Sequence, residues 1–291
     1  MVAGHMGGLL KEIRQAKGLT LRDVAGPYLS VSFLSKFERG ETEISLSRFL
    51  ALLENLNMDL AEFYGVYQEA EPTLAQSAIA KAGLAYQENN SLALKKYERE
   101  VRAAYQKTGR PYHLHYAIMM RSFYADLTGE EVPEADVLAL TDYLFGVEYW
   151  GLAELILLGN AMSAIQTATL NSLLTEMRQR TLGFGTTQEK ERLRIQLYIN
   201  GLNLFLARRE LALAKRVLVE LSDSGIPETW TYERLLLHFA KGQLAYFQGQ
   251  TQKGETLMKE CLTIGGMLGM EQVLLRLESV YEERMLSSIK Q

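Results

Sequence analysis

Residues 8–40 read GLLKEIRQAKGLTLRDVAGPYLSVSFLSKFERG, and this stretch decides the fold of the N-terminal part of the chain. Its apolar residues recur at helical spacing as far as Lys17 and Gly18, a basic last turn followed by a helix-ending glycine. A first helix is therefore expected to end at about Lys17. Thr20 and Ser30 each offer a hydroxyl group to the free N–H groups of a following helix. The stretch predicts three short helices in succession.

A tight turn separates the second of these helices from the third. Gly26 and Pro27 break the second helix, and Gly40 ends the third. Three short helices with a turn between the last two are typical of a helix-turn-helix, whose final helix fits a DNA major groove about 12 Å wide. A helical hairpin that packs against another element is the alternative interpretation of the bare pattern.

The exposed N-terminal end and outer face of the third helix are expected to face base edges or flanking phosphates. Arg22, in the first turn of the second helix, is a candidate for a phosphate contact, with that helix N-terminus as the alternative. The residues expected at the DNA are Arg22, Ser30, Val31, Ser32, Ser35, Lys36 and Arg39.

The distribution of charge agrees with DNA binding, although the whole chain has a net charge of −4. Residues 9–40 carry six basic and three acidic side chains, a balance of +3, whereas residues 41–66 carry one basic and five acidic ones, a balance of −4. Positive charge is thus concentrated on the segment expected to meet phosphate. Binding by one small domain would be weak and sensitive to salt, so a homodimer on double-stranded promoter DNA is expected.

The run SKFERG at residues 35–40 resembles the Cro and phage-repressor class of helix-turn-helix domains. The resemblance implies that Arg14 pairs with Glu38 as a structural ion pair rather than as a DNA contact. Two departures from that class are present. Leu21 stands where many relatives have a phosphate-binding Gln, and the turn at residues 26–29 is one residue shorter. The phosphate contact at this point is therefore expected from Arg22 or the helix N-terminus.

Composition predicts an all-α chain with about two domains, because there are only five prolines in 291 residues and little β-branched alternation. No apolar stretch approaches the length of a membrane span, and no basic region leads into an apolar run as in a secretory signal. The single cysteine, Cys261, excludes an internal disulfide and a Cys-based zinc site. We therefore expect a cytoplasmic protein that has no membrane partner.

The domain boundaries follow from helix and loop signals. Residues 44–64 are expected to form two more helices, which complete a five-helix DNA-binding domain at residues 7–67. Residues 68–73, QEAEPT, are acidic and polar and contain a proline, so they are expected to form a linker. Residues 74–290 are expected to form the second domain, which binds a ligand and dimerises.

Helix pairs are expected to repeat in the second domain at a spacing of about 40 residues. The clearest copies are LFLARRELALAKRVL at residues 204–218 and AYFQGQTQKGETLM at residues 245–258. Such pairs resemble tetratricopeptide repeats, which stack into a superhelix because no pair can bury its own apolar face. About five pairs are expected, with turns near residues 88–93, 128–133, 168–173, 209–214 and 249–254. A plain helical bundle is the alternative.

The first helices of the pairs should line the concave face of such a superhelix; they are expected at residues 73–88, 111–127, 150–164, 189–208 and 229–248. Side-chain amides carry both a donor and an acceptor, which suits them to hold the backbone of an extended peptide, while apolar neighbours would hold its side chains. The residues expected to bind a peptide are Asn160, Gln196, Ile199, Asn200, Asn203, Phe239 and Gln243. Solvation or helix capping is the alternative role for each amide.

The chain as a whole resembles the Rgg family of transcriptional regulators. The resemblance rests on SVSFLSKFERGE at residues 30–41 and on LTDYLFGVEYWGLAELILLGN at residues 140–160, followed by the tetratricopeptide-like pairs. It implies a cytoplasmic homodimeric transcription factor that a short hydrophobic signalling peptide controls through the concave face, as in quorum sensing.

No enzymatic site is expected from the sequence. His113 and His115 are two residues apart on a helix and so point to different faces, which argues against a shared metal, and no phosphate loop or catalytic triad motif is present. No cofactor is expected. The alternative function is a helical-repeat scaffold protein that uses the helix-turn-helix as a docking module. The sequence leaves the operator, the peptide, the sign of regulation and the dimer geometry open.

Overall fold

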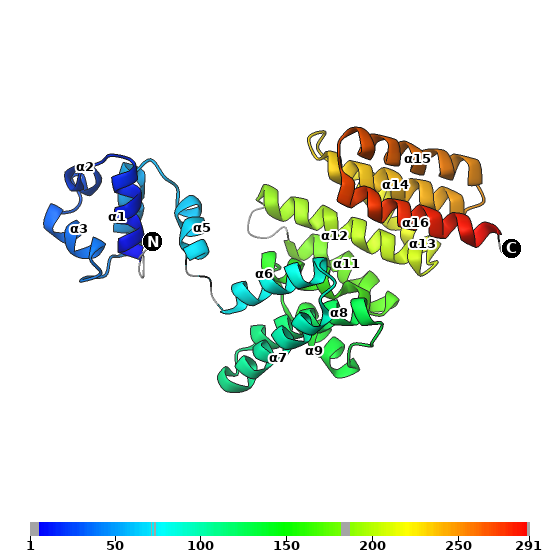
Figure 1. Cartoon of the computed structure of the whole chain (residues 1–291), viewed down its shortest axis with the longest axis horizontal. Helices are drawn as coiled ribbons and strands as arrows, with labels where there is room; N and C mark the ends of the chain where they lie inside the picture. Colours follow the sequence, from blue (N-terminus) through cyan, green and yellow to red (C-terminus); the bar gives the residue numbers. More distant parts are fainter. Residues whose placement is uncertain (1–5, 71, 73, 182–186, 290–291) are drawn as a thin grey trace. The chain divides into compact units, whose positions relative to one another are not determined.

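The computed structural model describes residues 6–70, 72, 74–181 and 187–289 (Figure 1). These residues form sixteen α-helices and one 3-10 helix, with no strand among them, as the composition predicts. The chain divides into two compact units, residues 1–81 and residues 82–291. An N-terminal helix-turn-helix domain is thus followed by tetratricopeptide-like helix pairs.

The first unit contains five helices whose ends follow the predicted caps. Gly18 takes the left-handed conformation with φ of 69°. The Thr20 hydroxyl accepts from the Asp23 backbone N–H at 3.2 Å, and the Asp23 carboxylate accepts from the Thr20 backbone N–H at 2.8 Å. The Ser30 hydroxyl accepts from the Phe33 N–H at 3.1 Å. The helices are α1 (Met6–Ala16), α2 (Leu21–Ala25), α3 (Val31–Glu38), α4 (Leu46–Asn55) and α5 (Leu60–Ala70).

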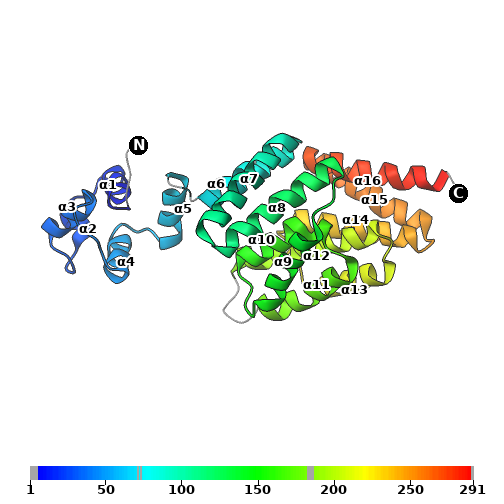
Figure 2. The ribbon, with the colours of Figure 1, turned by 90° about the horizontal axis from the view of Figure 1, so that it is seen from below.

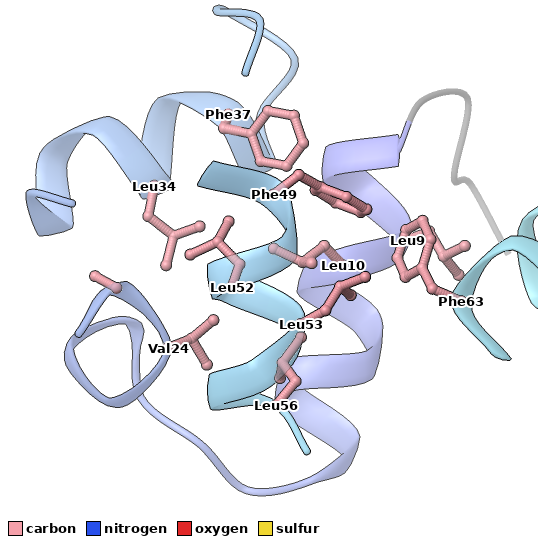
Figure 3. Close-up of a cluster of buried hydrophobic side chains, with 11 residues drawn as sticks. Leu9, Leu10, Val24, Leu34, Phe37, Phe49, Leu52, Leu53, Leu56 and Phe63 are labelled. Atoms are coloured by element: carbon pink, nitrogen blue, oxygen red, sulfur yellow. The ribbon is translucent and has the colours of Figure 1, made fainter. Parts of the chain in front are cut away.

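A core of leucine and phenylalanine side chains joins these five helices (Figure 3). Phe49 of α4 lies at its centre and packs edge-to-face against Phe63 of α5, with ring centroids 4.9 Å apart. Leu34 and Phe37 direct the inner face of α3 into the same cluster. The opposite face of α3 is therefore turned away from the core.

Helix α5 extends further than the sequence suggested. It continues through residues 68–70, which were assigned to the linker, because Gln, Glu and Ala are all good helix formers and the proline at position 72 is the first residue that cannot continue it. Helix α6 (Leu74–Gln87) contains the division between the two units.

The second unit consists of helix pairs in the predicted order. Its further elements are α7 (Ser91–Thr108), α8 (Pro111–Thr128), α9 (Glu134–Gly146), α10 (Leu152–Ala161), η1 (Met162–Ala164), α11 (Thr167–Thr181), α12 (Gln188–Ala207), α13 (Leu211–Asp223), α14 (Thr231–Phe247), α15 (Thr251–Met267) and α16 (Glu271–Ile289). Four of the five expected turns fall between helices.

The turn expected at residues 168–173 is wrong, because this segment lies inside α11. Its Ser, Thr and Asn content favours a loop, but Ser172 and Thr175 donate their hydroxyl protons to carbonyls one turn earlier in the helix. Leu170 and Leu173 are fully buried and fix the helix by packing. The actual turn is at Ile165 and Gln166, directly after η1.

The first helices of successive pairs pack against one another: α8 against α10, α10 against α12 and α12 against α14 (Figure 2). This arrangement places one face of each of these helices on the same side of the stack. Helix α16 follows the fifth pair without a described second helix and packs on α15.

Two glycines allow α14 and α15 to cross closely. A Cβ atom on Gly254 would lie 2.7 Å from the carbonyl oxygen of Gly242, which is backbone and cannot rotate away. Ala214 is the corresponding small residue in α13, and it is fully buried. In both pairs, a small residue near the start of the second helix is thus a packing requirement.

Replacing Gly254 by Ala should therefore lower the thermal unfolding midpoint, because overpacking costs about 1 to 3 kcal/mol and exceeds the gain in helix propensity. Gly266→Ala is the matched control, since its added Cβ would meet no atom within 4 Å on the same helix. That variant should unfold at a higher temperature than the parent. An unchanged or higher midpoint for Gly254→Ala would contradict the packing requirement.

Candidate functional site

The outer face of α3 is the candidate DNA-reading surface. Val31, Ser32, Lys36 and Arg39 are exposed and Ser35 is half-buried, while Arg22 of α2 is also exposed. Ser30 lies at the start of this face, but its hydroxyl group caps α3 through the Phe33 N–H. Of the seven residues expected at the DNA, six therefore have side chains that do not cap a helix.

Arg39 is held in place by two neighbours in the DNA-free domain. Its Nε and Nη2 atoms lie 2.6 and 2.8 Å from the two carboxylate oxygens of Glu41, and its Nη1 donates to the Ser35 hydroxyl at 2.6 Å. The hydrogen bond raises the pKa of Arg39 and lowers the pKa of Glu41. This pair could not be predicted from the sequence, because the two residues come together only through the bend at Gly40.

Two further side chains beside α3 were missed at the level of sequence. Tyr28 is 71% exposed in the turn before Ser30, which is unusual for so large an aromatic residue. The guanidinium carbon of Arg48, in α4, lies 5.7 Å from the centre of the Phe33 ring. The sequence offered one signal for each of them. Tyr28 is an aromatic residue in the short turn, and Arg48 is a lone basic residue after an acidic stretch.

Arg14 and Glu38 lie against each other inside the first unit. The Arg14 Nε and Nη2 atoms donate to the two carboxylate oxygens of Glu38 at 2.7 and 2.8 Å, and Nη1 donates to the Leu19 carbonyl at 2.9 Å. The two side chains are 9% and 4% exposed. The pair ties α1 to the last turn of α3, so it holds α3 in place without facing solvent.

A hollow of about 680 Å³ in the second unit brings together five of the seven predicted peptide-binding residues. These are Asn160, Asn200, Asn203, Phe239 and Gln243, contributed by α10, α12 and α14. The Gln243 amide donates to the Asn203 side-chain oxygen at 3.4 Å, and the Asn160 amide donates to the Ile156 carbonyl at 2.8 Å. Asn200 is exposed, and its side chain makes no hydrogen bond to another of the described residues.

The other two predicted residues do not line the hollow. Ile199 has no exposed surface and packs in the core between helices. Gln196 donates to the Glu233 carboxylate at 2.7 Å, in a cluster that Arg192 also joins. Ile199 lies one residue off the lining face of α12, whereas Gln196 shares the face of Asn200 and Asn203 but lies one turn before them, where it is not among the residues that line the hollow.

Several lining residues were missed, and four of them lie on α16, outside the expected inner helices. Helix α16 contributes Arg276, Leu277 and Val280 to the hollow. The repeat spacing of about 40 residues, extended once beyond the fifth first-helix, would have placed a sixth first-helix near residue 270. The remaining newly identified lining residues include Tyr86, Phe123, Asp126, Ser163, Leu236 and Glu283.

Charged and apolar groups are both present in the hollow. Loss of water around the carboxyl group raises the pKa of Asp126, and a hydrogen bond with Ser163 opposes that shift. Loss of water likewise raises the pKa of Tyr86, whose hydroxyl group also feels the charges of Asp126 and Arg276. The Arg276 Nη2 donates to the Tyr232 hydroxyl at 3.0 Å. Amides, an aliphatic wall and a few charges are suited to an extended peptide.

The described residues contain no group of three or more His, Cys, Asp or Glu side chains that could hold a metal ion. His113 and His115 are both buried; the His115 ring stacks on Tyr143 with centroids 4.0 Å apart, and burial lowers its pKa. Among those same residues, no helix is long and apolar enough to span a bilayer.

Two known protein families match this chain, one in each of its two units. The family described as "HTH-type transcriptional regulator Rgg, C-terminal domain" matches residues 94–279, and a helix-turn-helix family matches residues 10–63. The chain therefore belongs to the Rgg family of helix-turn-helix transcriptional regulators. Both the family and the fold are those of regulators and not of enzymes.

Solved structures agree over nearly the whole chain. The SHP pheromone receptor Rgg2 (C45S) of Streptococcus dysgalactiae has 28% identity and a TM-score of 0.79, over 95% of this chain and 98% of that one. A bacterial peptide pheromone/receptor complex has 13% identity and a TM-score of 0.71, over 96% of this chain and 98% of that one, and it shows the shared fold alone.

A curated relative matches the DNA-binding part. The transcriptional regulator DdrOP3 of Deinococcus deserti is 40% identical over 63 residues, which is 19% of this chain and 49% of that protein. The chain thus spans about half of the length of this relative.

Replacing Arg14 by Met should destabilise the first unit by about 3 to 5 kcal/mol, because it leaves the Glu38 carboxylate buried and unpaired. Urea unfolding followed by circular dichroism measures the loss. The double variant Arg14→Met with Glu38→Leu should recover most of it, since no charge then remains buried. A single variant as stable as the parent would show that the pair does not hold α3 in place.

Proposed function

We propose that this regulator is a cytoplasmic homodimer that binds promoter DNA through α3 and is controlled by a short hydrophobic peptide bound in the hollow of the second unit. The observation that carries the proposal is the convergence of four amide side chains from three consecutive inner helices on one hollow with aromatic and aliphatic walls. Family membership favours this function over that of a scaffold protein.

Peptide binding is supported by the chemistry of the hollow. Asn200 and Asn203 are about one turn apart on α12, and Gln243 stands opposite on α14. Amides at this spacing can donate to and accept from successive peptide groups, while Phe239 and Leu236 offer contacts to apolar side chains. A volume of about 680 Å³ suits a ligand of a few residues. Rgg2, the structural relative, is a pheromone receptor.

DNA binding through α3 is supported by its exposed polar face and by the fixed attachment of its inner face. Val31 and Ser32 lie in the N-terminal half, where a recognition helix meets base edges, and Ser35 and Lys36 follow in the second half. The exposed Arg22 is placed at the start of α2, as a phosphate contact requires.

A homodimer is supported by the weak binding expected of one small domain and by exposed apolar side chains near the end of the chain. Met267 is 82% exposed and Leu275 is 63% exposed, on the neighbouring helices α15 and α16, with Ile264 and Leu268 also exposed. Apolar residues gathered in this way commonly mark a surface between subunits.

The DNA contact can be tested at Lys36. Lys36→Gln should weaken binding to a mixed-sequence duplex and make its dependence on log salt concentration shallower by about 0.9, the value for one lost phosphate contact. Fluorescence anisotropy of the full chain over a salt series measures both quantities. Lys253→Gln, an exposed lysine of α15, removes the same charge far along the chain and should leave the slope unchanged. Equal slopes for parent and Lys36→Gln would place α3 away from the DNA.

The peptide contact can be tested at Asn203. Synthetic hydrophobic heptapeptides are screened against the full chain, and the tightest binder is labelled for anisotropy. Asn203→Ala should weaken its binding by about 1 to 3 kcal/mol, because peptide groups in the complex lose their partner. DNA binding without peptide should be unchanged, and Gln252→Ala on α15 should affect neither measurement. Failure of every peptide to bind, or equal affinity for parent and Asn203→Ala, would contradict the proposed site.

A further inference from the structure

The turn that ends α3 fixes the position of Glu41. Gly40 has φ of 73°, a conformation that few residues other than glycine adopt. The Gly40 N–H donates to the Phe37 carbonyl and the Glu41 N–H donates to the Lys36 carbonyl, both at 2.9 Å. These two bonds fold the chain back on the last turn of the helix. The backbone of Glu41 is thus held beside the exposed side chains of α3.

The Glu41 carboxylate binds the guanidinium group of Arg39 in the way that a phosphate would. Its two oxygens accept from Nε and Nη2 at 2.6 and 2.8 Å, and the Ser35 hydroxyl accepts from Nη1 at 2.6 Å. A carboxylate and a phosphate present the same pair of acceptor oxygens to the fork of an arginine. Each of the three guanidinium nitrogens of Arg39 therefore has a hydrogen-bond partner within the domain.

Glu41 also acts on the second cation of the reading helix. Hydrogen bonding to Arg39 lowers the pKa of Glu41, and the positive charges of Arg39 and Lys36 lower it further. Glu41 is therefore ionised at neutral pH and lies within electrostatic reach of both basic side chains of α3. It offsets part of the positive charge on the surface that meets DNA.

We infer that Glu41 is an affinity- and specificity-determining residue that competes with DNA phosphate for the Arg39 guanidinium group. The inference rests on the proposed DNA binding through α3. Phosphate contacts carry no sequence information, so an arginine held by the protein weakens binding to every sequence alike. The contacts of Val31, Ser32 and Ser35 with base edges then make up a larger share of the total binding free energy.

The chain offers a matched control two residues away. Glu43 is exposed, and no ion pair links it to another of the described residues. Glu43→Gln removes the same charge as Glu41→Gln and so reports the general effect of lower negative charge near the DNA. Any difference between the two variants reports the release of Arg39.

The test is the binding of the full chain to a fluorescein-labelled mixed-sequence duplex of about 30 bp, measured by anisotropy between about 50 and 200 mM salt. Glu41→Gln should bind several-fold more tightly than Glu43→Gln at the lowest salt. Its slope against log salt should be steeper by about 0.9, because one more phosphate is contacted, so its advantage should shrink about threefold across this range. In an Arg39→Gln background, most of the difference between the two glutamate variants should disappear, and only the smaller effect of Glu41 on Lys36 should be left.

Equal affinity and slope for Glu41→Gln and Glu43→Gln would overturn the inference, as would weaker binding by Glu41→Gln, which would mean that Glu41 orients Arg39 toward DNA. A larger effect of Glu41→Gln that persists undiminished in the Arg39→Gln background would also overturn it. A parent chain that binds no duplex at the lowest salt would instead reject DNA binding through α3. Thermal unfolding of both glutamate variants should match the parent, since the two side chains of the Arg39–Glu41 pair are about half exposed.

Discussion

Stacking of helix pairs is the constraint on which the second unit depends. A single pair of amphipathic helices leaves an apolar face uncovered, so α8, α10, α12 and α14 must pack on one another in sequence. That packing takes up large apolar side chains, such as Phe205 and Ile118, and leaves one face of each inner helix for other residues. Asparagine and glutamine can stand on that face at little cost, and they meet in one hollow because the helices are parallel neighbours.

The first unit obeys a different constraint, since it must hold a short helix rigid with a small core. Helix α3 has eight residues and would not be stable alone. Leu34 and Phe37 anchor it by packing, and the Arg14–Glu38 pair anchors its last turn to α1. The outer face is then free to carry Ser32, Lys36 and Arg39. A firmly attached inner face and an adaptable outer face are what a sequence-reading helix needs.

The sequence was sufficient to predict the helices and their ends wherever local chemistry determines structure. Caps and glycines placed the ends of α1 to α3, because each requires a specific residue at a specific position. It was insufficient where tertiary packing overrides local preference, as in α11, where buried leucines hold a Ser- and Thr-rich segment in a helix. Side-chain direction and position along the helix were the second limit: Ile199 is directed away from the hollow that Asn200 and Asn203 line. Gln196 shares their face but lies one turn earlier and bonds to Glu233. Contacts across a bend, such as that between Arg39 and Glu41, had no signal in the pattern.

Hydrogen–deuterium exchange of the full chain, with and without a saturating pool of short hydrophobic peptides, tests the central claim most directly. The account predicts that the peptides slow exchange in the part of α12 that contains Asn200 and Asn203 and in the part of α14 that contains Phe239 and Gln243. It predicts no direct protection of the outer helices α13 and α15. Protection confined to the outer helices, or exchange that no peptide changes, would contradict a peptide site in the concave hollow.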